Sequence, residues 1–520
     1  MLSRTAESEA LARDLAAALP GARVSSGPAD RVAYARDLWP RNQIVTRSGV
    51  AAPSPPSVVV WPEHTEHVAA TISFARARGI PVVPYGAGSG VCGGIQPEPV
   101  SIVLDLKRLR RITNVDADLL VAKAQAGIIG QHLEDDLGAR GFTLGHFPSS
   151  IYCSTLGGWV AGRSAGQCSG RYGKIEDMVL GLTCVDGRGQ VLAPSLDGPD
   201  AALLPLVIGS EGTLAVVVEA TLRIAPAPQG RTFASFSFPS IEAGLECVRR
   251  IYQADLRPAV ARLYDPFDSM LARRKHHARS AEHTPRRGRR DRGPGLASRL
   301  VDRVLRSPGL LNRFVELLPE ESFGGTLLVL VWEDAPSIAE AEASAATRIA
   351  AETGGKSSGE EPARRWLARR HSVSYRQSPV FAAGGFADTM EVASTWSRLL
   401  PMYYSVREAL SPHVFVMAHF SHAYPDGASI YFTFAGSAKS DAEALLVYDR
   451  AWRDALAAVI GTGGTLSHHH GVGRSKAPAM RKEQGPALDI VRALKREMDP
   501  DWILNPGVLI GPEDGAHRDP

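Results

Sequence analysis

The stretch LGHFPSSIYCSTLGGWVAGRSAGQCSGRYGKIEDMV, from Leu144 to Val179, carries most of the information about the fold. It is long, rich in small residues, and contains the adjacent pair Gly157 and Gly158. Small side chains allow a backbone to approach a ligand closely, so a run of this length suits a chain that lines an extended ligand. We expect the stretch to be nearly free of helix and to follow such a ligand.

A second glycine-rich segment, PYGAGSGVCGG, runs from Pro84 to Gly94 after a predicted strand. Glycines at this spacing allow backbone N–H groups to point at a diphosphate. The segment is not a Walker loop, because no G-K-[ST] ends it, and its spacing differs from the dinucleotide pattern G-x-G-x-x-G. Taken alone it is equally consistent with a tight turn after a strand.

The surrounding sequence predicts an α+β organisation. From Ser57, SVVVWPEHTEHVAATISFARARGIPVVPY reads as a strand, an amphipathic helix that begins near Pro-Glu, and a second strand, which is a β-α-β unit. Further strands are predicted in SIVLDL, LLVAKAQAGI and MVLGLTCVDGRGQVL. After Pro226, the strands TFASFSF and TLLVLVW occur with the long helical patterns IEAGLECVRRIYQA and IAEAEASAATRIAAE, which indicates a second domain.

Composition limits the class of protein. The 520 residues include 58 Lys and Arg against 55 Asp and Glu, so the small net charge of +3 gives no reason to expect nucleic acid as a partner. The five cysteines include no C-x-x-C pair, which favours reduced thiols in a cytoplasmic protein. No run approaches the roughly 20 apolar residues that span a bilayer. The N-terminus predicts an amphipathic helix and not a secretion signal.

One basic segment, RRKHHARSAEHTPRRGRRDRGPG at residues 273–295, has almost no apolar residues. Such a segment cannot bury enough surface to order itself, so we expect a flexible, solvated insertion. A lid, or a contact with an anionic membrane surface, is the alternative.

Together with GSEGTLAVV at Gly209–Val217, the two glycine-rich segments resemble the FAD-binding domain of the vanillyl-alcohol oxidase and p-cresol methylhydroxylase (PCMH) superfamily. Within that superfamily, the pattern P-S-S…STLGGW…IED is similar to the alkyldihydroxyacetonephosphate synthases. The resemblance implies a PCMH-type FAD-binding domain of two subdomains at 54–226 and an α+β cap (substrate) domain at 227–455. An N-terminal helical segment (1–53) would precede them, and a C-terminal segment (456–520) would return to the flavin.

The resemblance also implies a set of residues that bind FAD without a covalent bond. These are Pro84, Tyr85, Gly86, Ala87, Gly88, Ser89 and Gly90 at the diphosphate; Pro148, Ser149, Ser150, Ser154, Thr155, Gly157 and Gly158 along the flavin; and Gly162, Arg163, Ser164, Ala165, Ile175, Glu211, Gly212 and Val217. The family loop more often reads G-G-G-T-S, so Ala87 must avoid positive φ. The loop has no matching histidine that could tether the flavin. Cys92 is interpreted as a small buried residue, with a tether as the alternative.

Three consecutive histidines stand in TLSHHHGVGRSK, at Thr465–Lys476. The segment resembles SLSHHHGVGK of the alkyl-transferring enzymes, whereas related 2-hydroxyacid dehydrogenases show G-E-H-G-I-G there. We predict that His468, His469 and His470 act in the active site. A metal site is one alternative, since in an extended chain His468 and His470 share a face and His469 points away. No Cys/His cluster stands nearby to complete it, so no metal is expected. A structural polar turn is the other alternative.

Three further residues are implied by the same resemblance. Tyr431, in ASIYFTFAG, matches a tyrosine that transfers protons, although a tyrosine in such a strand is usually a core aromatic. Arg376, in SVSYRQSP, falls near an arginine that pairs with the substrate phosphate, for which a guanidinium is well suited. Arg262 matches an arginine close to the flavin, and a surface ion pair is its alternative role.

The implied activity is an FAD-dependent alkyl transfer in ether lipid synthesis. The acyl group of acyl-dihydroxyacetone phosphate would be exchanged for a fatty alcohol, with the flavin N5 holding the three-carbon unit in between and no net oxidation. The alternative is an FAD-dependent dehydrogenase or oxidase of a 2-hydroxyacid such as D-lactate or glycolate, which the ending DPDWILNPGVLIG resembles. A non-enzymatic flavin-binding protein is a third interpretation. The expected partners are lipid-like small molecules; a peripheral membrane contact and a homodimer are left open.

Overall fold

The computed structural model describes residues 2–47, 55–273, 308–309, 312–313, 325–372 and 378–510. The chain forms two compact units, one of residues 1–228 with 465–520 and the other of residues 229–464. The boundary predicted at residues 455/456 lies inside helix α18 (Asp441–Gly461), and the change of unit comes after Gly464. Most of the predicted basic insertion, 274–295, lies outside the described residues.

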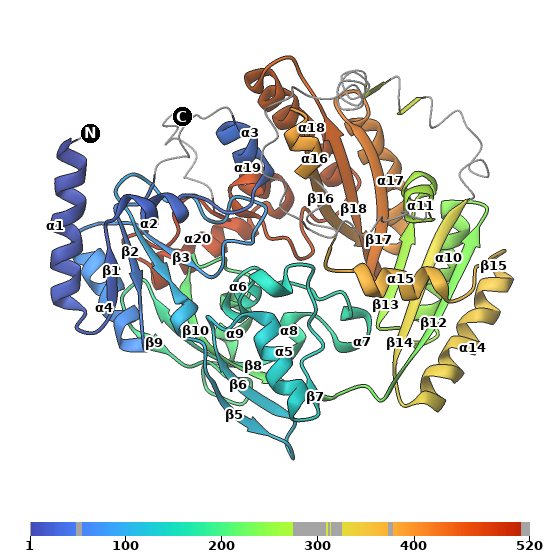
Figure 1. The fold of residues 1–520 in the computed structure, drawn as a ribbon, viewed down its shortest axis with the longest axis horizontal. Helices are drawn as coiled ribbons and strands as arrows, with labels where there is room; N and C mark the ends of the chain where they lie inside the picture. The colour runs from blue at the N-terminus through green and yellow to red at the C-terminus, as the bar shows by residue number, and fades with distance from the viewer. Residues whose placement is uncertain are drawn as a thin grey trace, which may run out of the picture. The chain divides into compact units, whose positions relative to one another are not determined.

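The first sheet of unit 1 has the order β1-β2-β4-β3. Strands β1, β2 and β3 of this sheet are labelled in Figure 1. The strands are β1 (Arg23–Ser25), β2 (Val58–Trp61), β4 (Ile102–Asp105) and β3 (Val82–Tyr85). Helix α4 (Thr65–Ala77) joins β2 to β3, which confirms the predicted strand-helix-strand order. The two strands are not neighbours, however, because β4 lies between them and pairs with both in parallel. All four residues of β2 are buried, as expected for a parallel strand whose two faces are covered.

The second sheet of unit 1 is antiparallel and has the order β5-β6-β10-β8-β9. Its strands and the short pair beside it are β5 (Ile112–Asp116), β6 (Val121–Gln125), β10 (Ala215–Arg223), β8 (Val179–Asp186), β9 (Val191–Leu192), β7 (Phe142–Thr143) and β11 (Ala225–Pro226). A hydrophobic core that includes Leu133, Trp159 and Leu182 packs against this sheet. This second sheet and the first one correspond to the two subdomains that the sequence predicts.

The stretch from Leu144 to Val179 is not nearly free of helix, so that expectation is wrong. It contains η2 (Ile151–Cys153), α6 (Leu156–Ala161), α7 (Ser169–Tyr172) and α8 (Ile175–Met178). Thr155 caps α6 by accepting a hydrogen bond from the N–H of Gly158 at 3.2 Å. A Cβ at Gly157 would lie 2.7 Å from the Cβ of Ala126, so the small residue allows this helix to pack closely on the chain after β6.

The remaining elements of unit 1 come from both ends of the chain. They are α1 (Leu2–Ala18), α2 (Pro28–Ala33), α3 (Pro40–Arg47), η1 (Leu106–Arg108), α5 (Gly130–Ala139), η3 (Ala201–Leu203), α9 (Leu204–Val207), α19 (Gly473–Gln484) and α20 (Ala487–Met498). The predicted N-terminal helix is confirmed as α1, with Leu15 buried on one side. Near the C-terminus, Leu504 forms a parallel bridge with Val82 of β3.

Unit 2 is built on a seven-stranded sheet of order β15-β12-β14-β13-β17-β18-β16. Its strands are β12 (Gly230–Phe238), β13 (Val260–Tyr264), β14 (Thr326–Asp334), β15 (Lys356–Ser357), β16 (Phe386–Thr395), β17 (Phe415–Ala423) and β18 (Gly427–Gly436). Its longer helices are α10 (Ile241–Gln253), α11 (Pro266–Arg273), α14 (Pro336–Glu352), α15 (Glu361–Arg369), α16 (Ser378–Ala382), α17 (Trp396–Leu410) and α18. Phe432 of β18 stacks on Tyr403 of α17, and Phe434 contacts Tyr448 and Trp452 of α18. These helices therefore cover one face of the sheet at β18.

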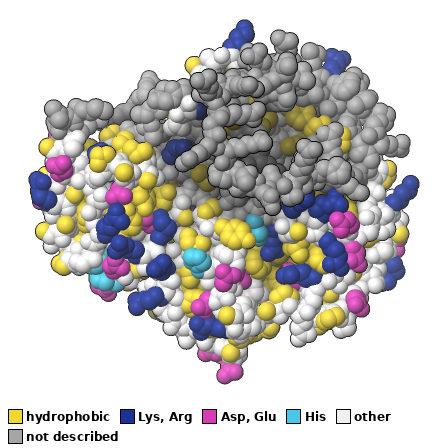
Figure 2. Space-filling view, viewed as in Figure 1, with side chains coloured by type: hydrophobic (Ala, Val, Ile, Leu, Met, Phe, Trp, Pro, Cys, Tyr) yellow, Lys and Arg dark blue, Asp and Glu magenta, His cyan; other side chains and the backbone are white. Residues whose placement is uncertain are grey.

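No helix in the part of the chain that the structure describes combines the length and the hydrophobicity needed to cross a bilayer. On the face shown in Figure 2, basic and acidic side chains are interspersed among the described residues. This distribution agrees with the near balance of charge in the sequence.

Candidate flavin site and active-site residues

The glycine-rich loop begins directly after β3 in unit 1. A Cβ at Gly86 would overlap with Thr155 Oγ1, and a Cβ at Gly88 would overlap with the hydroxyl of Tyr85. Gly88 also has φ +69°, whereas Ala87 is not among the positive-φ residues, as the sequence predicts. The loop is therefore a cradle in which only glycine fits at two positions. Its exposed backbone is suited to close contact with a diphosphate.

Residues from the N-terminal segment support this loop, and the sequence analysis missed them. The N–H of Leu38 donates to Gly90 O at 2.9 Å, and the N–H of Ile95 donates to Asp37 Oδ2 at 3.4 Å. A Cβ at Gly93 would lie 2.7 Å from Trp39 Cε3, so the indole packs on the loop. Asp37 is 2% exposed, and this burial raises the pKa of its carboxyl group to about 7.

We expect Asp37 to make the protein less stable as the pH rises. A carboxyl group whose pKa is higher in the folded than in the unfolded state stabilises the fold below the unfolded pKa of about 3.9, and this contribution is lost as the pH rises through the folded value. The melting temperature of the wild type, measured with excess FAD, is expected to fall between about pH 4 and pH 7. The melting temperature of Asp37→Asn should fall less steeply with pH, because the amide of Asn does not ionise.

The control for this measurement is Asp135→Asn, on the exposed side of α5, which should keep the wild-type slope. Glu134 is buried, and its pKa is also raised to about 7. Part of the fall of the melting temperature with pH therefore remains in every variant. Equal slopes for Asp37→Asn and the wild type would show that Asp37 does not carry the effect.

A basic cavity of about 700 Å³ lies beside the same loop. Lys107 lines it and donates from Nζ to Gly86 O at 3.1 Å and to the buried Asp105 Oδ2 at 2.7 Å. The other lining residues are Tyr34, Trp61, Glu63, Asp105, Arg108, Arg110 and Arg111. The lysine places a positive charge at the first glycine of the cradle. The sequence analysis did not single out these residues.

Lys107→Met is expected to raise the dissociation constant for FAD about tenfold, the effect of losing one positive charge near a diphosphate in a partly solvated site. The measurement is a titration of the apoprotein with FAD, followed by quenching of flavin fluorescence. Lys123→Met is the matched control, because Lys123 pairs with Glu219 on the second sheet, at 2.7 Å, and not with the loop. Equal affinity in the two variants would contradict a role for Lys107 in holding FAD.

Glu211 connects the turn before β10 to the segment that follows the histidines. Its carboxylate accepts hydrogen bonds from the N–H groups of Val472 at 2.6 Å and Gly473 at 2.9 Å, at the start of α19. Burial raises its pKa, while the two backbone donors and Lys476 oppose the rise. An anion is stabilised at a helix N-terminus. Glu211 therefore fixes the end of the histidine run; its predicted contact with FAD stays a prediction.

The three histidines do not alternate between two faces. His468 Nδ1 lies 2.9 Å from His469 Nδ1, and the rings of His469 and His470 are 4.8 Å apart. The metal alternative assumed an extended chain with His469 pointing away from its neighbours, and the segment is instead a series of bends. Gly471, with φ +83°, then turns the chain toward α19. The three imidazoles thus form one contiguous, partly exposed group.

Another histidine of unit 1, His146, was missed by the sequence analysis. It is fully buried, its Nε2 lies 2.8 Å from Ser164 Oγ, and its ring packs on Trp159 at 4.6 Å. Burial, with a smaller contribution from His469, lowers its pKa to about 3. A neutral imidazole at this position fixes the hydroxyl of Ser164, which is one of the predicted FAD residues.

Other predicted FAD residues are placed by contacts within unit 1. Ser154 Oγ accepts from Trp159 Nε1 at 2.8 Å, and Arg163, with φ +52°, pairs with Glu176 at 3.0 Å. Ile175 and Val217 belong to the hydrophobic core beneath the second sheet. A Cβ at Gly212 would lie 2.9 Å from Pro84 Cγ, so the turn at Gly209–Gly212 packs against β3 next to the glycine-rich loop. The segments at 84–90 and 209–212 are therefore brought together, as the resemblance implies.

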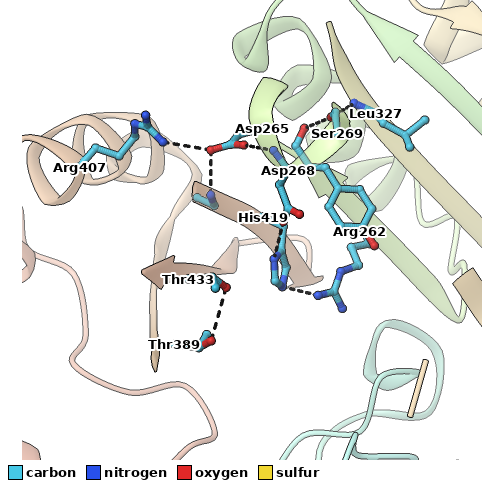
Figure 3. Close-up of polar contacts among 11 residues, drawn as sticks. Arg262, Asp265, Asp268, Ser269, Leu327, Thr389, Arg407, His419 and Thr433 are labelled. Atoms are coloured by element: carbon cyan, nitrogen blue, oxygen red, sulfur yellow. Dashed lines mark hydrogen bonds and ion pairs between the residues drawn. The ribbon is translucent and has the colours of Figure 1, made fainter. Parts of the chain in front are cut away.

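In unit 2, a polar cluster lies on the sheet (Figure 3). Arg262 of β13 contacts His419 Nε2, and His419 Nδ1 lies 3.2 Å from Asp268 Oδ2 of α11. The ring of His419 stacks on that of Tyr431 at 4.7 Å and 17°. The two predicted residues Arg262 and Tyr431 thus flank a histidine that the sequence analysis missed. Arg376 lies outside the described residues.

Asp265 fixes the elements around the cluster through three hydrogen bonds. Its Oδ2 accepts from Arg407 at 3.0 Å and from the N–H of Ala418 at 2.8 Å, and its Oδ1 accepts from the N–H of Asp268 at 2.9 Å. Asp265 therefore joins α11, α17 and β17 at one point. The sequence signal for it is weak, because an aspartate just before a proline is also common in turns.

Burial sets the protonation states of this cluster. It lowers the pKa of His419 well below the usual value, with Arg262 acting in the same direction. It raises the pKa of Tyr431 well above its usual range, with Glu391 adding to the effect and Arg262 opposing it. It raises the pKa of Asp268 to about 6. At neutral pH the cluster therefore presents a neutral imidazole, a protonated phenol and a guanidinium.

The glycine cradle with its lysine in unit 1 is suited to hold the diphosphate of a nucleotide cofactor. In sequence, residues 56–194 match the family model of the FAD binding domain. Residues 227–509 match the family model of the C-terminal domain of FAD linked oxidases. The chain belongs to the family of FAD linked oxidases, and its cofactor is FAD.

The chain is similar over most of its length to a synthase and to an oxidase subunit. An alkyldihydroxyacetonephosphate synthase of Trypanosoma brucei brucei is 26% identical over 491 residues, 91% of this chain and 75% of the relative. The glycolate oxidase subunit GlcD of Bacillus subtilis is 27% identical over 491 residues and 92% of both chains.

Solved structures agree on the fold. An alkyldihydroxyacetonephosphate synthase aligns with a TM-score of 0.73 at 23% identity, over 94% of this chain and 83% of the other. A p-cresol methylhydroxylase aligns with a TM-score of 0.70 at 14% identity, over 98% of both chains. The predicted resemblance and the α+β fold are confirmed: the chain is similar in sequence to the alkyldihydroxyacetonephosphate synthases and shares its fold with p-cresol methylhydroxylase.

We expect FAD to be released by acid or heat. Cys92 is 4% exposed and packs under Gly473, where any Cβ would overlap with the Cys92 carbonyl, so its thiol is a small buried group of the loop. After precipitation of the denatured chain, the flavin fluorescence should be found in the supernatant. Fluorescence that stays with the polypeptide in a denaturing gel, and is lost in Cys92→Ala, would instead identify a covalent bond.

Proposed function

We propose that this flavoprotein is an alkyl transferase that exchanges the acyl group of acyl-dihydroxyacetone phosphate for a fatty alcohol. The observation that carries the proposal is the group His468–His470, which stands where related 2-hydroxyacid dehydrogenases place a glutamate before one histidine. The similarity to alkyldihydroxyacetonephosphate synthases over about nine-tenths of the chain supports it.

The residues of this chain have distinct tasks in such a reaction. The substrate loses a proton from the carbon between its ketone and its ester, and then a carboxylate departs. Tyr431 and the histidine group would take up and return the protons of this reaction. Arg262, oriented by His419, supplies positive charge where negative charge develops on the ketone oxygen. Bound FAD supplies the group that accepts and returns electrons during the exchange.

Two parts of the proposal concern recognition of the substrate. Arg376 would bind its phosphate through two parallel hydrogen bonds. Because the proposed substrate has a long chain, we also propose a peripheral contact with a membrane. A homodimer is a separate proposal.

The test uses the flavin spectrum of the purified holoprotein without oxygen. Acyl-dihydroxyacetone phosphate should bleach the oxidised flavin band, and a long-chain alcohol should restore it with no electron acceptor present. D-Lactate and glycolate should leave the band unchanged. A band that responds to neither class of substrate would refute the proposal.

The second candidate function is oxidation of a 2-hydroxyacid. It is favoured by the similarity to the glycolate oxidase subunit, which spans 92% of both chains, and by the C-terminal segment from Asp499. In this case D-lactate or glycolate should bleach the flavin, and only oxygen, a quinone or a dye should restore it. That result would replace the transferase assignment.

A further inference from the structure

Strand β17 contains one residue more than its partner β18 at the level of the polar cluster. Ser421 pairs with Ser429 and Ala423 pairs with Ala428, so His422 is the extra residue of a β-bulge. Its backbone has φ +49°, in the left-handed region that a residue with a side chain rarely adopts. Such strain persists only where the surrounding structure enforces it, and it concentrates at functional sites.

The bulge changes the face on which His422 lies. In a regular strand, His422 would share a face with Phe420, whose ring packs on Tyr403 of α17 at 5.5 Å, on the helix-covered side. Instead, His422 Nε2 lies 3.2 Å from the hydroxyl of Tyr431, and the two rings are 6.0 Å apart at 30°. Bulges are known to re-aim a side chain next to active sites.

The neighbours of Tyr431 on the two adjacent strands are less suited than His422 to take its proton. His419, directly opposite on β17, has both ring nitrogens engaged, one with Arg262 and one with Asp268. Glu391, directly opposite on β16, is fully buried and disfavours a phenolate by its charge, as does Tyr424.

We propose that His422 is the proton partner of Tyr431, resting on the proposed role of Tyr431 in catalysis. As the phenol takes a proton from the substrate carbon, its own O–H bond breaks and the proton passes to Nε2 of neutral His422. The substrate C–H bond breaks and a new phenol O–H bond forms, so the histidine ends as the imidazolium and the substrate as the carbanion. The return transfer restores both groups when the product is protonated.

The first experiment needs no substrate and leaves His422 unchanged in the two proteins that are compared. Ring nitrogens of ¹⁵N-histidine-labelled holoprotein are compared by NMR in the wild type and in Tyr431→Phe, and the His422 signal is assigned by its loss in His422→Asn. Loss of the phenol should shift the Nε2 resonance and the pH titration of His422. A His422 signal that is the same in both proteins would overturn the proposal, whichever substrate the enzyme takes.

The second experiment measures turnover against pH, with whichever substrate class changes the flavin band. Asn tolerates left-handed φ, so His422→Asn keeps the bulge but cannot accept the proton. Turnover should fall at least about tenfold with little change in KM, and the acidic limb of the pH profile should disappear. His413→Asn, at a histidine paired with Asp454 in the same unit, is the matched control and should behave as the wild type.

A rescue experiment separates proton transfer from a purely structural role. His422→Gly removes the side chain and suits the positive φ. Added imidazole should restore part of its turnover, whereas acetate or added salt should not. Wild-type turnover and an unchanged pH profile in His422→Asn, or no rescue of a folded His422→Gly that has bound FAD, would each overturn the proposal.

Discussion

Tyr431→Phe is expected to lower turnover at least about 100-fold while the protein keeps its FAD, as for the loss of a group that transfers a proton in the rate-limiting step. The substitution removes only the hydroxyl, and the ring can still stack on His419. Burial keeps this phenol protonated at rest, so removal of its oxygen removes both a donor and an acceptor. Steady-state turnover and the ratio of flavin to protein absorbance measure the two effects.

The matched control is Tyr404→Phe, at an exposed tyrosine of α17 whose hydroxyl bonds to Glu242. It should retain wild-type turnover. Comparable losses in the two variants would point to a general effect on unit 2. Wild-type turnover in Tyr431→Phe would remove this residue from the proposed mechanism.

His469→Ala is expected to lower turnover at least about 100-fold without loss of FAD, since a histidine that exchanges protons near neutral pH contributes this much. Its ring is partly exposed and contacts both neighbouring histidines. The backbone of the run is held by Glu211 at Val472 and Gly473, so truncation of one imidazole should leave the segment in place.

The control for this variant is His64→Ala, at a half-exposed histidine of unit 1 beside Glu66. It should not change turnover. Metal analysis of the wild type supplies a further check. Stoichiometric zinc that disappears with His468→Ala or His470→Ala would show that the histidines are ligands, and the free-base role of His469 would then be wrong.

Local patterns were sufficient for most of the secondary structure. The run VVVW predicts β2, and the Pro-Glu start with helical spacing predicts α4, because each depends on residues within one strand or a few helical turns. The same holds for the glycine-rich loop, where the need for negative φ at Ala87 follows from its methyl group alone. The family and its cofactor also follow from motifs of this local kind.

Local patterns failed where a short element depends on what packs against it. The stretch after Leu144 contains few large residues, so it lacks the apolar periodicity that identifies a helix. Helix α6 forms because Thr155 caps it and because Gly157 packs against Ala126. The three histidines likewise bend together instead of alternating.

The tertiary structure alone decided the partners of the polar groups. Glu211 reaches Val472, Asp37 reaches Ile95, and Arg262 reaches His419, each across many residues of sequence. The bulge at His422 moves an imidazole to the face of Tyr431, against the alternation of a regular strand. A buried polar group must find a partner, but which partner it finds depends on the order and register of whole strands and helices, and these are set by long-range packing that no short stretch of sequence contains.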